Sequence, residues 1–305
     1  MGGFTPHSRA GLLSRSSMHD FQILFDHGER SDLLDPVYSP YGKLGFPAPP
    51  ADRPWVYANF VQTLDGIVSL LGVNASGADI AQSEEDRWLM DLLRAHADAV
   101  LLGMGTLMLE KRLERPRPRG PVFRIVEPTL QQLRAKLRRG MERNIFVSAT
   151  GNLQLAEFAV FDGDRVDSAI ITTVAGAERL WPQQETHPHV KIIVAGEGSE
   201  ADLPSAMRML RQEMGIKYLL CEGGPVLYGH MIRAGMIDEK FLTVAPMDAG
   251  QDIPPEQETV PWKQPARRPT IFSGTGFTKE ELVRWHWVSC RKVGDMQFNR
   301  YRVIR

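Results

Sequence analysis

Cysteine is scarce in this sequence, with only Cys221 and Cys290 among 305 residues. The two lie far apart, and their positions match neither a zinc-ligand spacing nor a disulfide framework. The eight histidines form no HxxE or HExxH cluster, so no metal site is expected. A reducing compartment is therefore predicted, and the protein is expected to be cytoplasmic.

Net charge and long apolar runs are also lacking. A formal charge of −1 provides no overall field that would attract nucleic acid or an anionic membrane. No apolar run approaches the roughly 20 residues needed to span a bilayer, and residues 1–20 lack the continuous apolar segment of a signal peptide. We therefore expect no nucleic-acid partner and no membrane partner, and any electrostatic argument has to be local.

The remaining composition is that of a globular protein, because 43% of the residues are hydrophobic and 24% are charged. The segment 35–54 contains proline and glycine too densely for regular structure. Residues 1–52 are therefore predicted to form an irregular arm on the surface of one domain, residues 53–305.

From residue 53 onward, apolar runs alternate with helical patterns, which predicts an α/β sheet. Strands are predicted at 55–62, 98–103, 144–150, 168–173, 190–198, 217–222 and 239–246. Helices are predicted at 83–96, with Ser83 as the N-cap, at 203–215 and at 225–235. The segments 281–290 and 296–303 alternate apolar and polar residues, which is typical of antiparallel strands at one side of a sheet.

Two predicted strands end in glycine-rich turns. "KYLLCE" runs into Gly223, Gly224 and Pro225, and "DAVLLG" runs into a Gly103-Met104-Gly105 turn. Glycine lets the backbone approach a ligand closely, proline suits the first turn of a helix, and helix N-termini at strand ends favour anions. The pair could grip the two ends of a pyrophosphate, whereas each turn alone could also be a plain connection without a ligand.

Three charged residues stand out in addition to these turns. Glu222 ends a buried strand, so its carboxylate requires a partner or a ligand, and it could hold a polar substrate or act as an acid. Asp65 precedes Gly66 in a typical hairpin turn, and either shapes that turn or helps to order an active site. Arg94 closes an amphipathic helix, where a cation interacts favourably with the helix dipole.

The segment 111–143 is strongly basic, with 11 Lys or Arg residues against three acids. It could recognise a phosphate, such as the 2′-phosphate of NADPH, or it could simply form a solvated face. Nucleic acid is disfavoured because the segment contains almost no aromatic residues.

Four motifs taken together resemble one family: "ANFVQTLDGIVS", "LLRAHADAVLLGMGT", "LLCEGGPVL" and "MIRAGMIDEKFLTVAP". The set resembles the reductase domain of bacterial riboflavin biosynthesis, the C-terminal half of the bifunctional pyrimidine deaminase/reductase, over roughly residues 53–305. The resemblance implies a dihydrofolate-reductase-like, three-layer α/β/α fold with a mixed, mostly parallel central sheet and antiparallel C-terminal strands. It also implies NADPH-dependent reduction of the ribosyl group of a 5-amino-6-(5-phosphoribosylamino)uracil-type substrate to ribityl, in a homodimer.

The resemblance assigns roles residue by residue. Implied cofactor contacts are Gly103, Gly105, Thr106, Glu110, Ser148, Gly223, Gly224, Pro225, Val226 and Leu227. Implied substrate contacts are Asn59, Ser76, Arg94 and Glu222, and the predicted catalytic residues are Glu222 and Asp65. Trp285 and Trp287 could contribute to the dimer interface or could be buried in the protein's own core.

The sequence also departs from the family pattern. Glu110 replaces the first aspartate of the usual Asp-Asp-Pro, and the loop around Ser76 lacks the usual tryptophan. The deaminase signature PCxxC is absent, and the HxE tripeptide occurs only as His27-Gly28-Glu29 in the short N-terminal arm, so riboflavin synthesis would require a separate deaminase. Two alternatives keep the fold: a reductase of a pterin such as dihydrofolate, and a nucleotide-binding regulatory protein without turnover.

Overall fold

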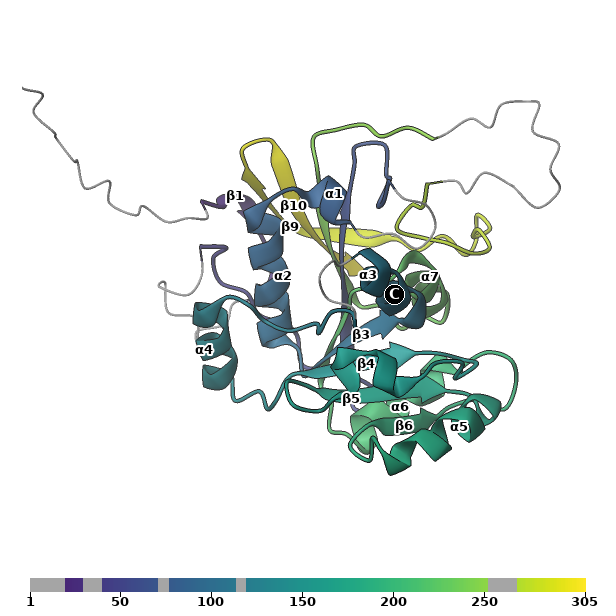
Figure 1. Cartoon of the computed structure of the whole chain (residues 1–305). Helices are drawn as coiled ribbons and strands as arrows, with labels where there is room; N and C mark the ends of the chain where they lie inside the picture. The colour runs from purple at the N-terminus through teal and green to yellow at the C-terminus, as the bar shows by residue number, and fades with distance from the viewer. Residues whose placement is uncertain (1–19, 30–39, 71–76, 114–118, 252–267) are drawn as a thin grey trace, which may run out of the picture.

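A computed structural model describes residues 20–29, 40–70, 77–113, 119–251 and 268–305 of the chain (Figure 1). The strands are β1 (Gln22–Asp26), β2 (Trp55–Gln62), β3 (Ala99–Gly103), β4 (Arg143–Val147), β5 (Asp167–Thr172), β6 (Lys191–Val194), β7 (Tyr218–Cys221), β8 (Glu239–Val244), β9 (Trp285–Val293) and β10 (Met296–Val303). The α-helices are α1 (Ala78–Ala81), α2 (Glu84–His96), α3 (Met104–Leu113), α4 (Pro128–Lys136), α5 (Val174–Leu180), α6 (Leu203–Gln212) and α7 (Pro225–Arg233). Short 3-10 helices lie at Leu155–Glu157, Ala159–Phe161 and Trp181–Glu185.

The described strands form one sheet in the order β1-β9-β10-β8-β2-β7-β3-β4-β5-β6. The seven strands from β8 to β6 are parallel to their neighbours. β10 pairs antiparallel with both β8 and β9, and β9 pairs antiparallel with β1. The expected mixed, mostly parallel sheet with antiparallel C-terminal strands is confirmed.

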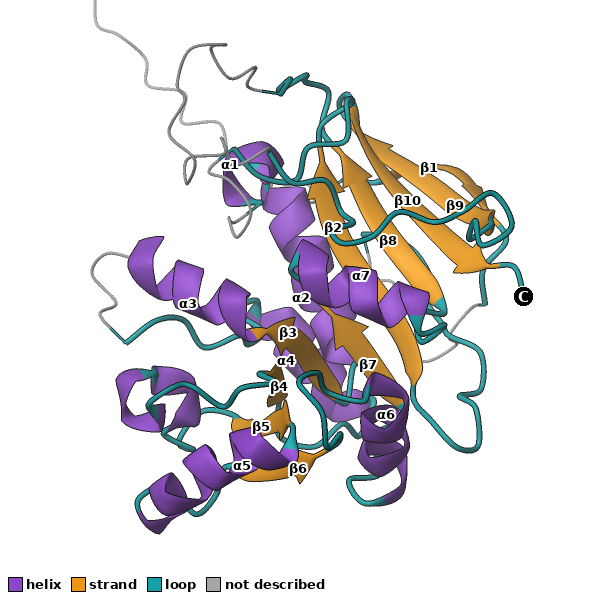
Figure 2. Cartoon of the chain, turned by 90° about the vertical axis from the view of Figure 1, so that its right-hand side faces the viewer, coloured by secondary structure: helices purple, strands orange, loops and turns teal. Residues whose placement is uncertain are grey.

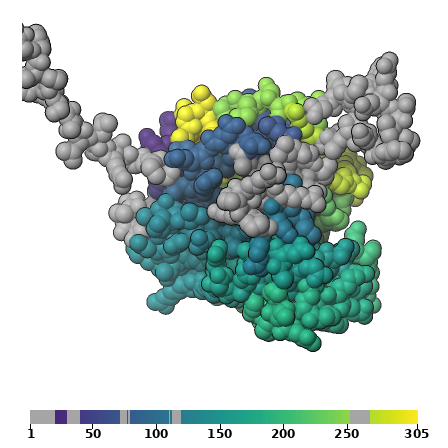
Figure 3. Space-filling model, viewed as in Figure 1, coloured from purple at the N-terminus to yellow at the C-terminus, as the bar shows by residue number. Residues whose placement is uncertain are grey.

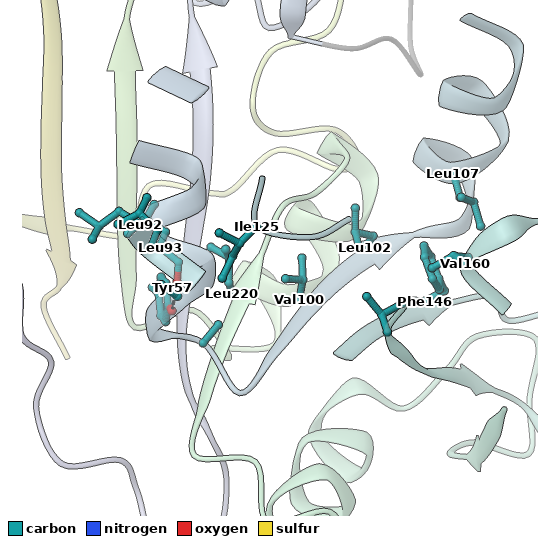
Figure 4. Close-up of a cluster of buried hydrophobic side chains, with 14 of the residues drawn as sticks. Tyr57, Leu92, Leu93, Val100, Leu102, Leu107, Ile125, Phe146, Val160 and Leu220 are labelled. Carbon is teal, nitrogen blue, oxygen red and sulfur yellow. Dashed lines mark hydrogen bonds between the residues drawn. The ribbon is translucent and has the colours of Figure 1, made fainter. Parts of the chain in front are cut away.

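Helices cover both faces of the sheet, as a parallel sheet requires. Tyr57 of β2 and Phe146 of β4 face one side, where they pack with α2 and α4 residues such as Leu92 (Figure 4). Val56 and Ala58 face the other side, together with buried residues of α6 and α7, and Figure 2 shows α7 in front of the sheet. The protein therefore has three layers, α/β/α.

Helix α2 begins where the sequence predicts. The Ser83 hydroxyl accepts hydrogen bonds from the backbone N–H groups of Glu85 (3.1 Å) and Asp86 (3.2 Å). These bonds satisfy two donors that the first turn of a helix leaves free. The apolar stripe of α2, including Leu92 and Leu93, is fully buried against the sheet.

The prediction of an irregular arm is wrong for Gln22–Asp26, which forms edge strand β1 on β9. Neighbouring residues of the arm enter the core, because Phe21, Tyr41 and Leu44 are buried. The Arg291 guanidinium of β9 donates to the backbone carbonyl of Tyr41 (2.6 Å) and pairs with Asp26 (2.6 Å). The arm is thus integrated with the C-terminal strands.

Two buried acids lie at the start of β8, with Asp238 just before the strand and Glu239 as its first residue. Asp238 accepts both terminal nitrogens of Arg53, at 2.7 and 2.8 Å, and the backbone N–H of Val56. Glu239 pairs with Arg300 at 2.7 Å and with Arg302 at 2.6 Å. These contacts join β2, β8 and β10 at the amino end of the parallel strands, so the opposite end is open for a site.

The lower part of the molecule in Figure 3 has the teal and green colours of the residues that form β4, β5, β6, α5 and α6. No helix among the described residues combines the length and the hydropathy needed to cross a membrane.

Candidate functional site

The carboxyl ends of β7, β3 and β4 lie side by side. Leu101 of β3 is in register with Cys221 of β7, and Gly103 is in register with Val147 of β4. The chain after each strand therefore emerges at one edge of the sheet. The two glycine turns meet there, because the N–H of Gly103 donates a 2.7 Å hydrogen bond to the carbonyl of Gly223.

A cavity of about 440 Å³ opens beside the joined turns. Eight of the ten predicted cofactor residues line it: Gly103, Gly105, Thr106, Ser148, Gly224, Pro225, Val226 and Leu227. Gly223 does not line the cavity, but its carbonyl accepts the hydrogen bond from Gly103. The Glu110 side chain lies outside the described part of α3. The structure thus brings the predicted set together, although it comes from three separate segments.

The backbone around the cavity has little room for side chains. A Cβ on Gly224 would lie 3.2 Å from the Thr106 hydroxyl, and a Cβ on Gly223 would lie 3.0 Å from the Phe60 ring. Gly223 also has a φ of 86°, which disfavours other residues. No side chain caps α7 at Gly224, and no acid lies in the first turn of α3. The free N–H groups of these helix starts suit a phosphate, so the residues present fit a dinucleotide.

Glu222 lies between the end of β7 and Gly223 and has a partner within the protein. Its two carboxylate oxygens each accept a 2.7 Å hydrogen bond from Arg94, one from Nε and one from Nη2. The two side chains are only 8% and 7% exposed. Arg94 is therefore a buried partner of Glu222 rather than the solvent-facing helix charge that the sequence allowed.

Further contacts hold Arg94 in this position. Its Nη1 donates to the backbone carbonyl of Arg124 (3.0 Å) and lies 3.6 Å from the Asp91 carboxylate. Asp91 in turn accepts the backbone N–H groups of Val126 and Glu127. Burial opposes the charge on Arg94, but attraction by Glu222 outweighs it, and the pKa of Arg94 is raised. Burial raises the pKa of the Asp91 carboxyl.

Asn59 of β2 lies near this ion pair, because the preceding residue Ala58 is in register with Cys221, which precedes Glu222. The Asn59 Oδ1 atom is buried and has no hydrogen-bond partner in the described part of the protein. A buried amide oxygen normally accepts a hydrogen bond, so this atom lacks a hydrogen-bond donor. Asn59 on β2 and Glu222 just after β7 thus lie close to each other, and neither is among the described residues that line the cavity.

Asp65 lies in an exposed turn and not in the lining of the cavity. It accepts the backbone N–H groups of Ala249 (3.1 Å) and Gly250 (2.7 Å) and the hydroxyl of Thr63. The Thr63 bond, supported by that of Ala249, lowers the pKa of Asp65. These contacts fit the turn interpretation. Ser76, predicted to contact the substrate, lies outside the described residues.

Most described members of the basic segment have partners within the protein. Arg119 pairs with Asp162, Arg139 with Asp98 and Arg143 with Asp167. The described lining of the cavity contains no lysine or arginine. Sequence reasoning missed Thr150 and Asn152, which follow β4, and Leu203 and His230 on α6 and α7. For the segment after β4, the polar residues at the end of "NIFVSAT" were the sequence signal that could have indicated a ligand site.

Fold and cavity together define a class of protein. It is a three-layer α/β protein with a cavity at the carboxyl edge of its sheet, where two glycine turns lead into helices. This arrangement is typical of proteins that bind nucleotides.

Comparison with known proteins gives the family. Residues 54–264 match the family described as the RibD C-terminal domain, and the chain belongs to this family. It is 27% identical over 208 residues to 2,5-diamino-6-ribosylamino-4(3H)-pyrimidinone 5′-phosphate reductase of Archaeoglobus fulgidus, covering 66% of this chain and 85% of that protein. A reductase of the same name from Methanothermobacter thermautotrophicus is 27% identical over 199 residues, covering 65% and 80%.

Solved structures show the same fold. A pyrimidine reductase-like protein of Corynebacterium diphtheriae superposes with a TM-score of 0.61 at 23% identity, covering 83% of this chain and 93% of that chain. RibD of Acinetobacter baumannii gives a TM-score of 0.56 at 16% identity, covering 83% and 58%. The family expected from the sequence motifs is confirmed.

Proposed function

We propose that the protein is an NADPH-dependent reductase that converts the ribosyl group of a pyrimidine ribosylamine 5′-phosphate to a ribityl group in riboflavin biosynthesis. The observation that carries the proposal is the hydrogen bond that joins the turns of Gly103 and Gly223 beside the cavity. Because the two turns are joined, the N-termini of α3 and α7 are close enough to contact the same ligand. When bound, a reduced nicotinamide dinucleotide supplies the hydride.

The residues of the chain supply binding and orientation. Gly224 and Thr106 hold the pyrophosphate, with the free N–H groups at the start of α7. Glu222 and Asn59 offer acceptors to the amino groups of a pyrimidine, since each carboxylate oxygen paired with Arg94 keeps a second lone pair. Arg94 fixes the direction of the Glu222 carboxylate through two hydrogen bonds, so the substrate is oriented with its sugar carbon in place for reduction.

Three substrates test the proposal, with loss of NADPH absorbance as the readout. They are 5-amino-6-(5-phosphoribosylamino)uracil, the 2,5-diaminopyrimidinone for which the two archaeal relatives are named, and dihydrofolate. Turnover of either pyrimidine supports the proposal, and turnover of dihydrofolate alone would identify a pterin reductase. NADPH binding without turnover of any of them would favour a regulatory nucleotide-binding protein.

A variant pair tests the substrate side. We expect Asn59→Ala to raise KM for the pyrimidine about 10-fold, because an acceptor for its amino group is lost, and to leave NADPH binding unchanged. Gln297→Ala removes an exposed amide of β10 and serves as the control. Equal KM values for the two variants would remove Asn59 from the proposed site.

We also propose that the protein is a homodimer that pairs through the aromatic face of β9, β10 and β1. Trp287 is 46% exposed, stacks on Tyr301 and meets Phe25 edge to face. Exposed aromatic clusters of this kind are typical of protein interfaces.

Light scattering tests the dimer. We expect Trp287→Lys to convert a dimer to a monomer, whereas Trp181→Lys, at an exposed tryptophan of a 3-10 helix, leaves the mass unchanged. A monomeric wild-type protein would refute this proposal.

A further inference from the structure

The loop that follows β4 is fixed rigidly on helix α5. The Thr173 hydroxyl donates to the Ala149 carbonyl at 2.8 Å. A Cβ on Gly151 would lie 2.2 Å from the Gly176 carbonyl oxygen, and a Cβ on Gly176 would lie 2.7 Å from the Ala149 carbonyl oxygen. No side chain fits between these backbones, so loop and helix form one unit.

This contact brings Arg179 of α5 to the wall of the cavity. Its Nη1 donates a 2.6 Å hydrogen bond to the carbonyl of Thr150, which lines the cavity together with Ser148 and Asn152. Arg179 is exposed and makes no ion pair within the described part of the chain. A guanidinium has five N–H donors, so four remain beyond the bond to Thr150.

The strand order indicates which part of a bound dinucleotide would lie here. The pyrophosphate site at Gly224 and Thr106 lies between the acceptors on β2 and β7 and the loop after β4. With the nicotinamide beside Glu222 and Asn59, the adenosine lies on the side of Ser148 and Thr150. Val226 and Leu203, which line the cavity from α7 and α6, offer an apolar surface to the adenine.

We infer that Arg179 pairs with the 2′-phosphate of the adenosine ribose and gives the enzyme its preference for NADPH over NADH. The inference rests on the proposed function only in that a nicotinamide dinucleotide occupies the cavity. Arginine suits this role because its planar fork matches phosphate geometry. The hydroxyls of Ser148 and Thr150 add donors for the same phosphate. The described lining also contains one carboxylate, that of Glu200. It comes from the segment after β6, two strands away from β4, so it belongs to a different part of the lining from Ser148 and Thr150.

Calorimetric titration with NADPH and with NADH tests the inference without requiring turnover. We expect Arg179→Gln to weaken NADPH binding about 10- to 100-fold, the range of a lost charged hydrogen bond, and to change NADH binding less than about twofold. Arg179→Lys should retain part of the preference. The control is Arg165→Gln, an exposed arginine before β5 and hence at the opposite end of the sheet, which should change neither affinity.

Each other outcome overturns something specific. Equal affinity of the wild type for both cofactors, or equal weakening of both by Arg179→Gln, would overturn the role of Arg179. Failure to turn over any pyrimidine, with the NADPH preference intact, would overturn the proposed substrate and leave this inference standing. Absence of binding of either dinucleotide would overturn both. Unchanged melting of the Arg179 variants shows that the fold is retained.

Discussion

Removing Arg94 leaves Glu222 buried without its partner, and the cost can be worked out from the contacts. Arg94→Met removes two charged hydrogen bonds of 2.7 Å, each contributing about 1.5–3 kcal/mol. Both side chains are more than nine-tenths buried, so solvent screens them little. Breaking one partner of such a pair typically costs about 3–5 kcal/mol, and we expect that loss in the free energy of unfolding.

Urea denaturation measures the loss, and a double-mutant cycle isolates the pair. Arg94→Met/Glu222→Met should cost about 2–3 kcal/mol less than the sum of the single variants, since neither charge then remains unpaired. The control is Lys111→Met, which breaks the more exposed pair with Glu157 and should cost less than about 1 kcal/mol. A loss below about 1 kcal/mol for Arg94→Met, or strict additivity in the cycle, would refute the reasoning.

Three further predictions follow from other contacts. Gly224→Val should weaken NADPH binding at least about 100-fold in calorimetry, because its side chain fills the space beside Thr106. The control Gly140→Val, at a position with open space, should bind NADPH normally. Normal binding by both variants would contradict the proposed pyrophosphate site at Gly224. Glu239→Leu should lower the free energy of unfolding by about 3–5 kcal/mol, because it strands Arg300 in a buried position, and a near-neutral result in urea would contradict this. Burial lowers the pKa of Lys240 to about 8 from the usual 10.5, so between these pH values the unfolded state binds more protons and the free energy of unfolding should rise with pH. Lys240→Met should lack this rise of about 1–3 kcal/mol. The same pH dependence in both proteins would refute the lowered pKa.

Much of the central sheet is predictable because its signals are local. The apolar run at 55–62 matches β2 at both ends, and Ser83 caps α2 as predicted. The strand predicted at 144–150 stops at Val147. The residues after it had strand-like composition, but they form the loop that packs on α5. Tertiary contact, which the sequence pattern does not show, decides that boundary.

The parts that sequence reasoning missed depend on distant partners. Glu222 could be recognised as a buried acid that needed a partner, but that partner lies 128 residues earlier in the chain. β1 is short and contains only a weak pattern, and its conformation depends on pairing with β9. Arg179 carried no motif at all. Its place at the cavity follows from the contact between Gly151 and Gly176, whose spacing in the sequence has no characteristic signature.

The pairing of β1 with β9 also determines when the protein can finish folding on the ribosome. Ile23 must wait for Arg291, some 270 residues of synthesis later, which takes roughly 15–50 s at about 5–20 residues per second. During this time Phe21, which is buried in the finished fold, lacks the neighbours that cover it, whereas Ile23 and Leu24 stay about half exposed even in the native state. The N-terminal strand is therefore made early but can pair only after nearly the whole chain has been synthesised.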